Sequence, residues 1–179
     1  MKKILLLFTL FATLIIYAQE KKLKTGNSIE NAEIGLIKKD WSNILEFEVK
    51  GGKEHIRFFP VEVTNLNSNI TLKALEFDFD ASKSKRVYND EIKELIIFLD
   101  SYVLPNLQMT EDKKKSIEYF FNSDELYLTF YLKNGKKSFD IYPKDDLGFV
   151  LWENGFSIEK EKDFKRFQEL VFMLKQIIK

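Results

Sequence analysis

Residues 133–143 read Lys-Asn-Gly-Lys-Lys-Ser-Phe-Asp-Ile-Tyr-Pro, and residues 50–60 read Lys-Gly-Gly-Lys-Glu-His-Ile-Arg-Phe-Phe-Pro. In each stretch an Asn-Gly or Gly-Gly pair supplies the positive φ angles of a type I′ turn, and alternating apolar residues flank that pair. The sequence therefore predicts two β-hairpins of the same design. We expect them to anchor two similar halves of a single domain over residues 31–179, namely residues 31–105 and residues 116–179.

The two turns also predict which side chains share a face, because side chains alternate between the two faces of a strand. One face of each hairpin is apolar, with Phe47 opposite Ile56 in the first hairpin and Phe130 opposite Phe139 in the second. The other face of the first hairpin carries the expected pairs Glu46–Arg57 and Glu48–His55. The other face of the second hairpin carries Tyr127, Tyr131 and Tyr142. We expect the apolar faces to point to the core and the other faces to point to water.

Two amphipathic segments predict helices. The first begins near Asn89 and is expected to end at Pro105, and the second begins near Glu161. With four strands expected in each half, we predict an α+β fold. It is a tandem pseudo-repeat of a four-stranded antiparallel β-meander plus a helix, with the two helices packed on one face of the sheet. This layout resembles that of β-lactamase-inhibitor-like folds, and no residue role follows from the resemblance.

The amino-terminal residues have the pattern of a secretory signal peptide, residues 1–18. Lys2 and Lys3 precede an apolar run that ends at Ile16, and a polar leader at residues 19–30 follows. We expect cleavage after Ala18, with an uncleaved anchor as the alternative because Ile16 is bulkier than the residue usual at that position. No membrane span is expected in the mature chain. The protein is therefore expected to be exported to the periplasm or secreted, as a bacterial envelope protein.

Charge and composition exclude several classes of function. The chain has 28 basic and 28 acidic residues, and loss of Lys2 and Lys3 leaves a slightly acidic mature chain, so we expect no nucleic-acid partner. It has no cysteine and one histidine, which excludes disulfides, histidine-based triads and multi-histidine zinc sites. No phosphate-binding loop, nucleophile elbow or dinucleotide motif is present. We expect no cofactor, no metal site and no enzymatic activity.

The leading hypothesis is a non-catalytic module that binds a protein or peptide partner in the envelope. Clustered tyrosines favour partner surfaces, because a tyrosine buries a large ring and also keeps a polar hydroxyl. The candidate binding residues are those expected on the open face of the sheet: Tyr127, Tyr131, Tyr142, Glu46, Glu48, His55 and Arg57. Strand propensity alone would also account for the tyrosines, and a surface ion pair with Glu48 would account for His55.

Two alternative functions stay open. Glu76, Asp78 and Asp80 alternate along one expected strand, so their carboxylates share a face, as a carboxylate-dependent hydrolase requires. Lys83, Lys85 and Arg86 are close enough in sequence to neutralise these acids, which favours a solvated face over a site. The second alternative is a structural component of the envelope without a discrete ligand.

Overall fold

The computed structural model describes residues 36–50, 55–79, 84–107 and 116–178. The expected signal peptide at residues 1–18, the leader at residues 19–30 and the Gly51-Gly52 turn lie outside the described residues. The described chain forms helices and two antiparallel sheets of five and four strands, so the prediction of an α+β fold is confirmed. Within the described residues, no helix combines the length and apolar character needed to cross a membrane.

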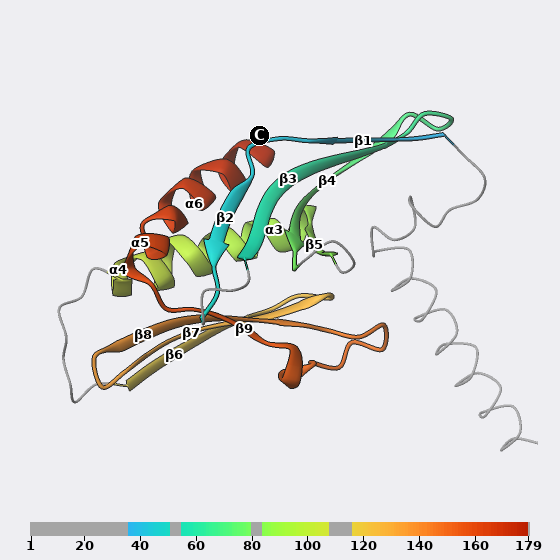
Figure 1. Cartoon of the computed structure of the whole chain (residues 1–179). Helices are drawn as coiled ribbons and strands as arrows, with labels where there is room; N and C mark the ends of the chain where they lie inside the picture. The colour runs from blue at the N-terminus through green and yellow to red at the C-terminus, as the bar shows by residue number, and fades with distance from the viewer. Residues whose placement is uncertain (1–35, 51–54, 80–83, 108–115, 179) are drawn as a thin grey trace, which may run out of the picture. The chain divides into compact units, whose positions relative to one another are not determined.

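The first sheet contains strands β1 (Ile37–Trp41), β2 (Leu45–Glu48), β3 (His55–Asn65), β4 (Ile70–Asp78) and β5 (Ser84–Tyr88) (Figure 1). Its strand order is β1-β3-β4-β5, and β2 also pairs with β3. The predicted register of the first hairpin is confirmed, because Phe47 lies opposite Ile56 and Glu48 lies opposite His55. The sequence analysis missed β5, in which charged residues obscure the alternation of a strand.

The second sheet contains β6 (Ser116–Asn122), β7 (Leu126–Lys133), β8 (Lys136–Pro143) and β9 (Phe156–Ile158), in that order. Its central hairpin has the predicted register, with Phe130 opposite Phe139 and Tyr127 opposite Tyr142. The connecting residues Asn134 and Gly135 have φ angles of 53° and 77°, both positive as a type I′ turn requires. The turn residues therefore fix the register of this hairpin.

In the chain, one helical segment follows the last strand of each sheet. The first runs continuously through α3 (Asn89–Ile97), the π-helical turn η1 (Phe98–Val103) and α4 (Leu104–Leu107). The second comprises α5 (Glu161–Phe164) and α6 (Arg166–Ile177). The prediction that the first helix ends at Pro105 is wrong by two residues. The Asn106 side chain donates a 2.7 Å hydrogen bond to the Tyr102 carbonyl, which supports the backbone across the proline.

The described chain divides into two compact units. The smaller unit comprises residues 36–38 and 63–72, where the Asn65 side chain accepts hydrogen bonds from the backbone N–H groups of Asn67 and Ser68. The larger unit comprises residues 39–62 and 73–178. It contains both helical segments and every described residue that was predicted to take part in a site.

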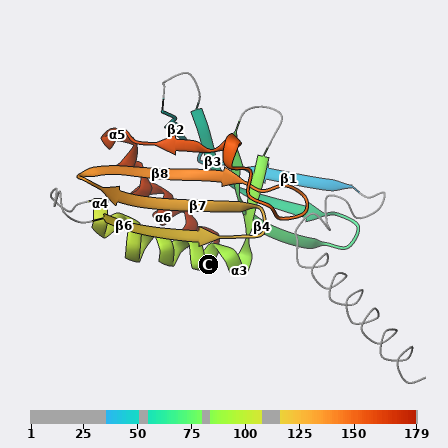
Figure 2. The ribbon, with the colours of Figure 1, turned by 90° about the horizontal axis from the view of Figure 1, so that it is seen from below.

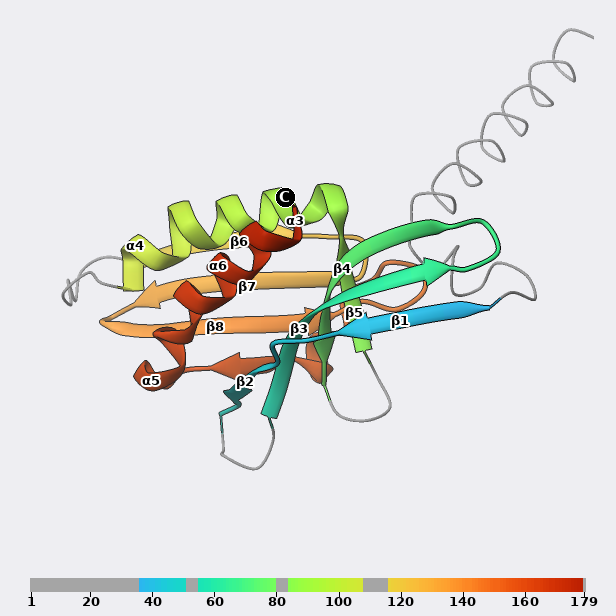
Figure 3. The same ribbon diagram turned by 90° about the horizontal axis from the view of Figure 1, so that it is seen from above.

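The core of the larger unit lies between the strands and the helices. Both helical segments cover one face of the second sheet, as seen from above in Figure 3. The ring of Phe167 from α6 lies 5.1 Å from that of Phe47 in β2 and 4.6 Å from that of Phe139 in β8, measured between centroids. Phe98 of η1 also packs against Phe139. One α6 side chain thus joins the first sheet to the second.

The sequence predicts a single sheet, but the structure contains two. Strand β5 runs across the strands of the second sheet instead of alongside them (Figure 3). Backbone ladders form only between strands that lie side by side, and within the described residues no ladder joins the two sheets. Single hydrogen bonds connect them instead. The backbone N–H of Lys50, after β2, donates to the Ser157 carbonyl of β9 at 2.8 Å, and the backbone N–H of Arg86 in β5 donates to the Glu125 carboxylate, in the β6–β7 turn, at 2.8 Å.

The tandem repeat is not confirmed by the strand order. The sequence match aligns the start of the first half with β6, which pairs with β7 in the second sheet. The corresponding strand β1 pairs with β3 and not with β2. The two halves therefore share a hairpin register and a strand-then-helix order, but their first strands are placed differently.

Candidate functional site

The predicted binding residues separate into two groups. Glu46, Glu48, His55 and Arg57 lie on β2 and β3 of the first sheet. The three tyrosines lie on β7 and β8 of the second sheet. The sequence analysis placed all seven on one open face, and this placement is wrong because the hairpins belong to different sheets.

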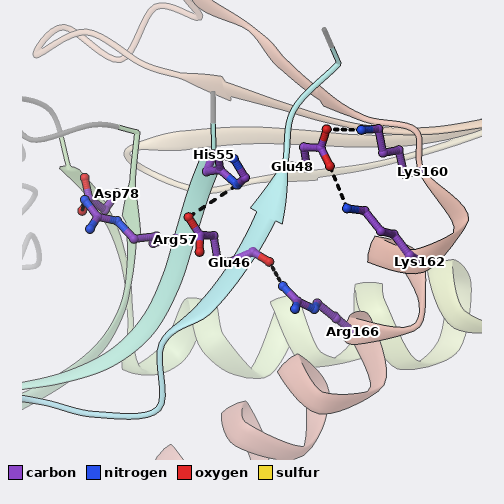
Figure 4. A network of polar contacts seen from close by, with 8 residues as sticks. All are labelled: Glu46, Glu48, His55, Arg57, Asp78, Lys160, Lys162 and Arg166. Carbon is purple, nitrogen blue, oxygen red and sulfur yellow. Dashed lines mark hydrogen bonds and ion pairs between the residues drawn. The ribbon is translucent and has the colours of Figure 1, made fainter. Parts of the chain in front are cut away.

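The first group forms a polar cluster whose charges are paired within the protein (Figure 4). Glu48 binds Lys160 and also Lys162, the latter at 2.7 Å between Oε2 and Nζ. Hydrogen bonds from these two lysines lower the pKa of Glu48 to about 2. Both lysines lie at the start of the second helical segment. The cluster therefore fastens that segment to the edge of the first sheet.

The ion pairs of the polar cluster differ from those predicted. His55 Nδ1 lies 3.4 Å from Glu46, diagonally across the hairpin, and not against Glu48. Arg57 pairs with Asp78 of β4 at 2.7 Å, and not with Glu46. The predicted register is correct, but neighbours from β4 and from the α5 region supply closer charges than the facing residues do.

The described carboxylates that were considered for a hydrolase are also paired with basic side chains. Glu76 is 5 % exposed and lies 2.8 Å from both Lys39 and Arg86. Burial raises the pKa of Glu76, but hydrogen bonds from Lys39 and Arg86 outweigh it and leave this pKa below its ordinary value. Asp78 is held by Arg57, and Asp80 lies outside the described residues. The two described carboxylates are thus bound by cations, which is the arrangement of a structural ion-pair network.

Two residues of the second group are part of an apolar surface. It lies on the face of the second sheet that the helices leave uncovered (Figure 2). Tyr127 and Tyr142 lie opposite each other, with ring centroids 6.4 Å apart. Phe120 of β6 stacks beside Tyr127 at 6.0 Å. Trp152 meets Tyr127 at 5.4 Å and Tyr142 at 4.9 Å, both edge to face. We call these four connected rings, Phe120, Tyr127, Tyr142 and Trp152, the aromatic surface.

The outer members of the aromatic surface are open to water. Phe120 is 65 % exposed and Trp152 is 61 % exposed, whereas Tyr127 and Tyr142 between them are half-buried. Exposed aromatic rings that touch one another are unusual on a protein surface, where single apolar side chains are the norm. The arrangement places four ring systems within reach of one partner.

The loop between β8 and β9 holds Trp152 in place. Trp152 begins the short 3-10 turn η2 (Trp152–Asn154), which is followed at once by Gly155. A Cβ atom at Gly155 would lie 2.3 Å from Cε1 of Tyr142, so only glycine allows the chain to pass so close to that ring. The tyrosine ring and the returning chain are therefore fitted to each other.

The same loop exposes two further apolar side chains near its tip. The Asp145 carboxylate accepts hydrogen bonds from the backbone N–H groups of Leu147, at 2.9 Å, and Phe149, at 2.8 Å. Gly148 between them has a φ angle of 84°, which favours glycine. Leu147 is 81 % exposed and Phe149 is 67 % exposed. The loop is thus held by its own hydrogen bonds while its apolar side chains face outward.

Tyr131 does not belong to the aromatic surface. It lies opposite Glu118 and Ser138, toward the end of the sheet where the Asn134-Gly135 turn lies. There it borders a hollow that is also lined by Lys50 and Glu159, which pair with each other at 2.8 Å. The predicted set of three tyrosines therefore reduces to the facing pair Tyr127 and Tyr142.

Sequence reasoning missed Phe120, Trp152 and the apolar loop tip. Phe120 could have been found, because Glu118, Phe120 and Asn122 alternate outward along β6 while Tyr119 and Phe121 point inward. Trp152 carried no such signal. Its place depends on how the loop folds back over β8.

The described residues offer no metal site, since they contain no suitable group of three or more histidine or acidic side chains. No protein-family model matches the chain, and no curated protein or solved structure is similar enough to count as a relative.

Proposed function

We propose that the protein is a non-catalytic binding module that holds a protein or peptide partner on the aromatic surface. The observation that carries the proposal is the connected set of four rings, two of them largely exposed. Trp and Tyr dominate the binding energy of protein interfaces, because each buries a large and rigid area on contact. The polar cluster is not part of this proposal, since its charges are already paired.

A photo-crosslinking experiment tests the proposal. The photoreactive residue benzoylphenylalanine replaces Phe120 in one variant and Phe172 in a matched control. Phe172 is an exposed phenylalanine of α6, 67 % exposed against 65 % for Phe120. After irradiation of intact cells, we expect a discrete crosslinked product from position 120 and none from position 172. Equal crosslinking from both positions, or none from position 120, would contradict the proposal.

We further propose that the protein acts in the bacterial envelope after export. The support is the charged start, apolar run and Ala18-Gln19 junction of the sequence. The amino-terminal sequence of the protein purified from its native cells tests this point. The expected first residue is Gln19, and recovery of the intact Met1 end would favour a retained anchor.

The internal duplication also remains a proposal. Its support is the equivalent register of the two hairpins and the helix that follows the last strand of each sheet. If the halves share an origin, related sequences should retain paired features, such as the apolar pairs Phe47–Ile56 and Phe130–Phe139. Independent variation of the two hairpins among relatives would argue against it.

A further inference from the structure

Three of the four rings of the aromatic surface, Phe120, Tyr127 and Trp152, come from segments that contain acidic residues but no basic ones. Tyr142 comes from β8, which carries Lys136 and Lys137 at its other end. Residues 117–132 and residues 145–159 together lack both lysine and arginine. Their acidic residues are Glu118, Asp124, Glu125, Asp145, Asp146, Glu153 and Glu159. In a chain with equal numbers of acidic and basic residues, this is a marked local excess of negative charge.

Several of these acids border the rings directly. Glu153 follows Trp152 within η2, and Asp146 precedes Leu147 in the exposed part of the loop. Burial is the first cause that raises the pKa of Tyr127, and the charge of Glu118 raises it further. The rim of the aromatic surface is therefore negative.

Nearby lysines offset only part of this charge. Lys50 pairs with Glu159 at 2.8 Å. Lys144, directly after β8, is 8 % exposed, and its ammonium donates a hydrogen bond to the Ser123 carbonyl, so this positive charge lies largely below the surface. Lys133 and Lys136 lie opposite each other at the far end of the same hairpin, beside the Asn134-Gly135 turn. The hydrogen bonds that Asp145 accepts come from neutral backbone groups, so they leave its negative charge in place.

We propose that the aromatic surface binds a cationic, extended polypeptide segment whose basic residues alternate with apolar ones. This inference rests on the proposed function and adds the chemistry of the partner. Lys and Arg side chains bind favourably over the faces of Trp, Tyr and Phe rings, and carboxylates at the rim strengthen this preference. A small cation would cover one ring only. The exposed rings of Phe120 and Trp152 and the loop tip at Leu147 instead offer separate contacts to successive side chains of one segment.

Three labelled peptides of equal length test the inference. Each has about twelve residues, enough to cross several strands of a sheet. Apolar residues alternate with Lys in the first peptide, with Ser in the second and with Glu in the third. Binding to the full mature chain is measured by fluorescence anisotropy. We expect the Lys peptide to bind at least about tenfold tighter than the Glu peptide, with a preference that shrinks as salt is raised.

Variants separate the contributions of rings and charge. Trp152→Ser should remove most binding of the Lys peptide, and Asp146→Asn with Glu153→Gln should weaken it several-fold. Phe172→Ser and Glu169→Gln, both exposed on α6, serve as matched controls and should leave it unchanged. Circular dichroism confirms that each variant is folded.

The outcomes distinguish this inference from the proposed function. One outcome would overturn the inference and leave the proposed function standing. In that outcome the Ser and Lys peptides bind equally well, and Trp152→Ser abolishes their binding whereas Asp146→Asn with Glu153→Gln does not. If Trp152→Ser leaves the binding of the Lys peptide unchanged, the inference is overturned, because the peptide would then bind elsewhere on the protein. Dimers that dissociate in Trp152→Ser would also overturn it, since a second copy of the chain would be the occupant.

Discussion

The polar cluster of the first sheet and the tyrosines of the second sheet were both expected to face a partner, but their contacts within the protein differ. In the polar cluster, Glu48 binds two lysines and Arg57 binds Asp78. In the aromatic surface, Phe120 and Trp152 remain largely exposed to water. The cluster satisfies its charges internally, whereas the surface leaves apolar area unburied. The two regions therefore differ in the contacts that they leave unmade within the protein, and this difference, not residue type, is the reason to propose a binding site on the aromatic surface.

The largest expected effect concerns the core that supports both regions. Phe167→Ala should destabilise the protein by about 3–5 kcal/mol, because it removes a fully buried ring that packs against both Phe47 and Phe139. The free energy of unfolding in urea measures this effect. Phe172→Ala, an exposed position on the same helix, should stay within about 0.5 kcal/mol of the wild type. A cost below about 1 kcal/mol for Phe167→Ala would mean that the two regions do not share this core.

A smaller effect is expected where the chain passes the aromatic surface. Gly155→Ala should cost about 1–3 kcal/mol, because the added methyl group overlaps the Tyr142 ring and forces it to move. The near-ultraviolet circular dichroism of the aromatic rings should change with it. Asn154→Ala, at the exposed neighbouring position, is the control. An unchanged spectrum in Gly155→Ala would contradict the described fit between the returning chain and the Tyr142 ring.

The smallest effect is a change in how the stability of the protein depends on pH, and it arises at the polar cluster. The pKa of Glu48 is lowered to about 2 from an ordinary 4.5 by Lys160 and Lys162. The unfolded chain therefore takes up a proton before the folded chain does, and stability falls as the pH drops from about 4.5 toward 2. Glu48→Gln should make the acid side of the stability profile shallower. An unchanged slope would mean that the two lysines do not hold Glu48 in solution.

The sequence predicts local structure well for physical reasons. The Asn134-Gly135 turn determines the register of the second hairpin, and alternation then assigns Phe130 to the core and Tyr127 to the open face. Helical periodicity likewise predicted the two amphipathic helices, whose residues Leu95 and Leu170 are both 1 % exposed. These outcomes depend on residues that are close together in the chain.

Features that depend on distant residues could not be predicted in the same way. Alternation does not indicate which strands become neighbours, so the division into two sheets was missed. The partners of Glu48 are 112 and 114 residues away in the sequence. Trp152 reaches Tyr142 only because the loop after β8 folds back over that strand. The aromatic surface was thus half visible in the sequence, through its two tyrosines, and Phe120 of β6 and Trp152 of the loop complete it.

Affinity capture with paired variants compares the aromatic surface with the polar cluster in a single experiment. The mature protein, the double variant Phe120→Ser/Trp152→Ser and the double variant Glu46→Gln/Glu48→Gln are each used as bait for the envelope fraction of the native cells. We expect a stoichiometric partner with the wild-type protein and with the Glu46/Glu48 variant, and its loss with the Phe120/Trp152 variant. Retention by the Phe120/Trp152 variant, or loss only with the Glu46/Glu48 variant, would contradict the account.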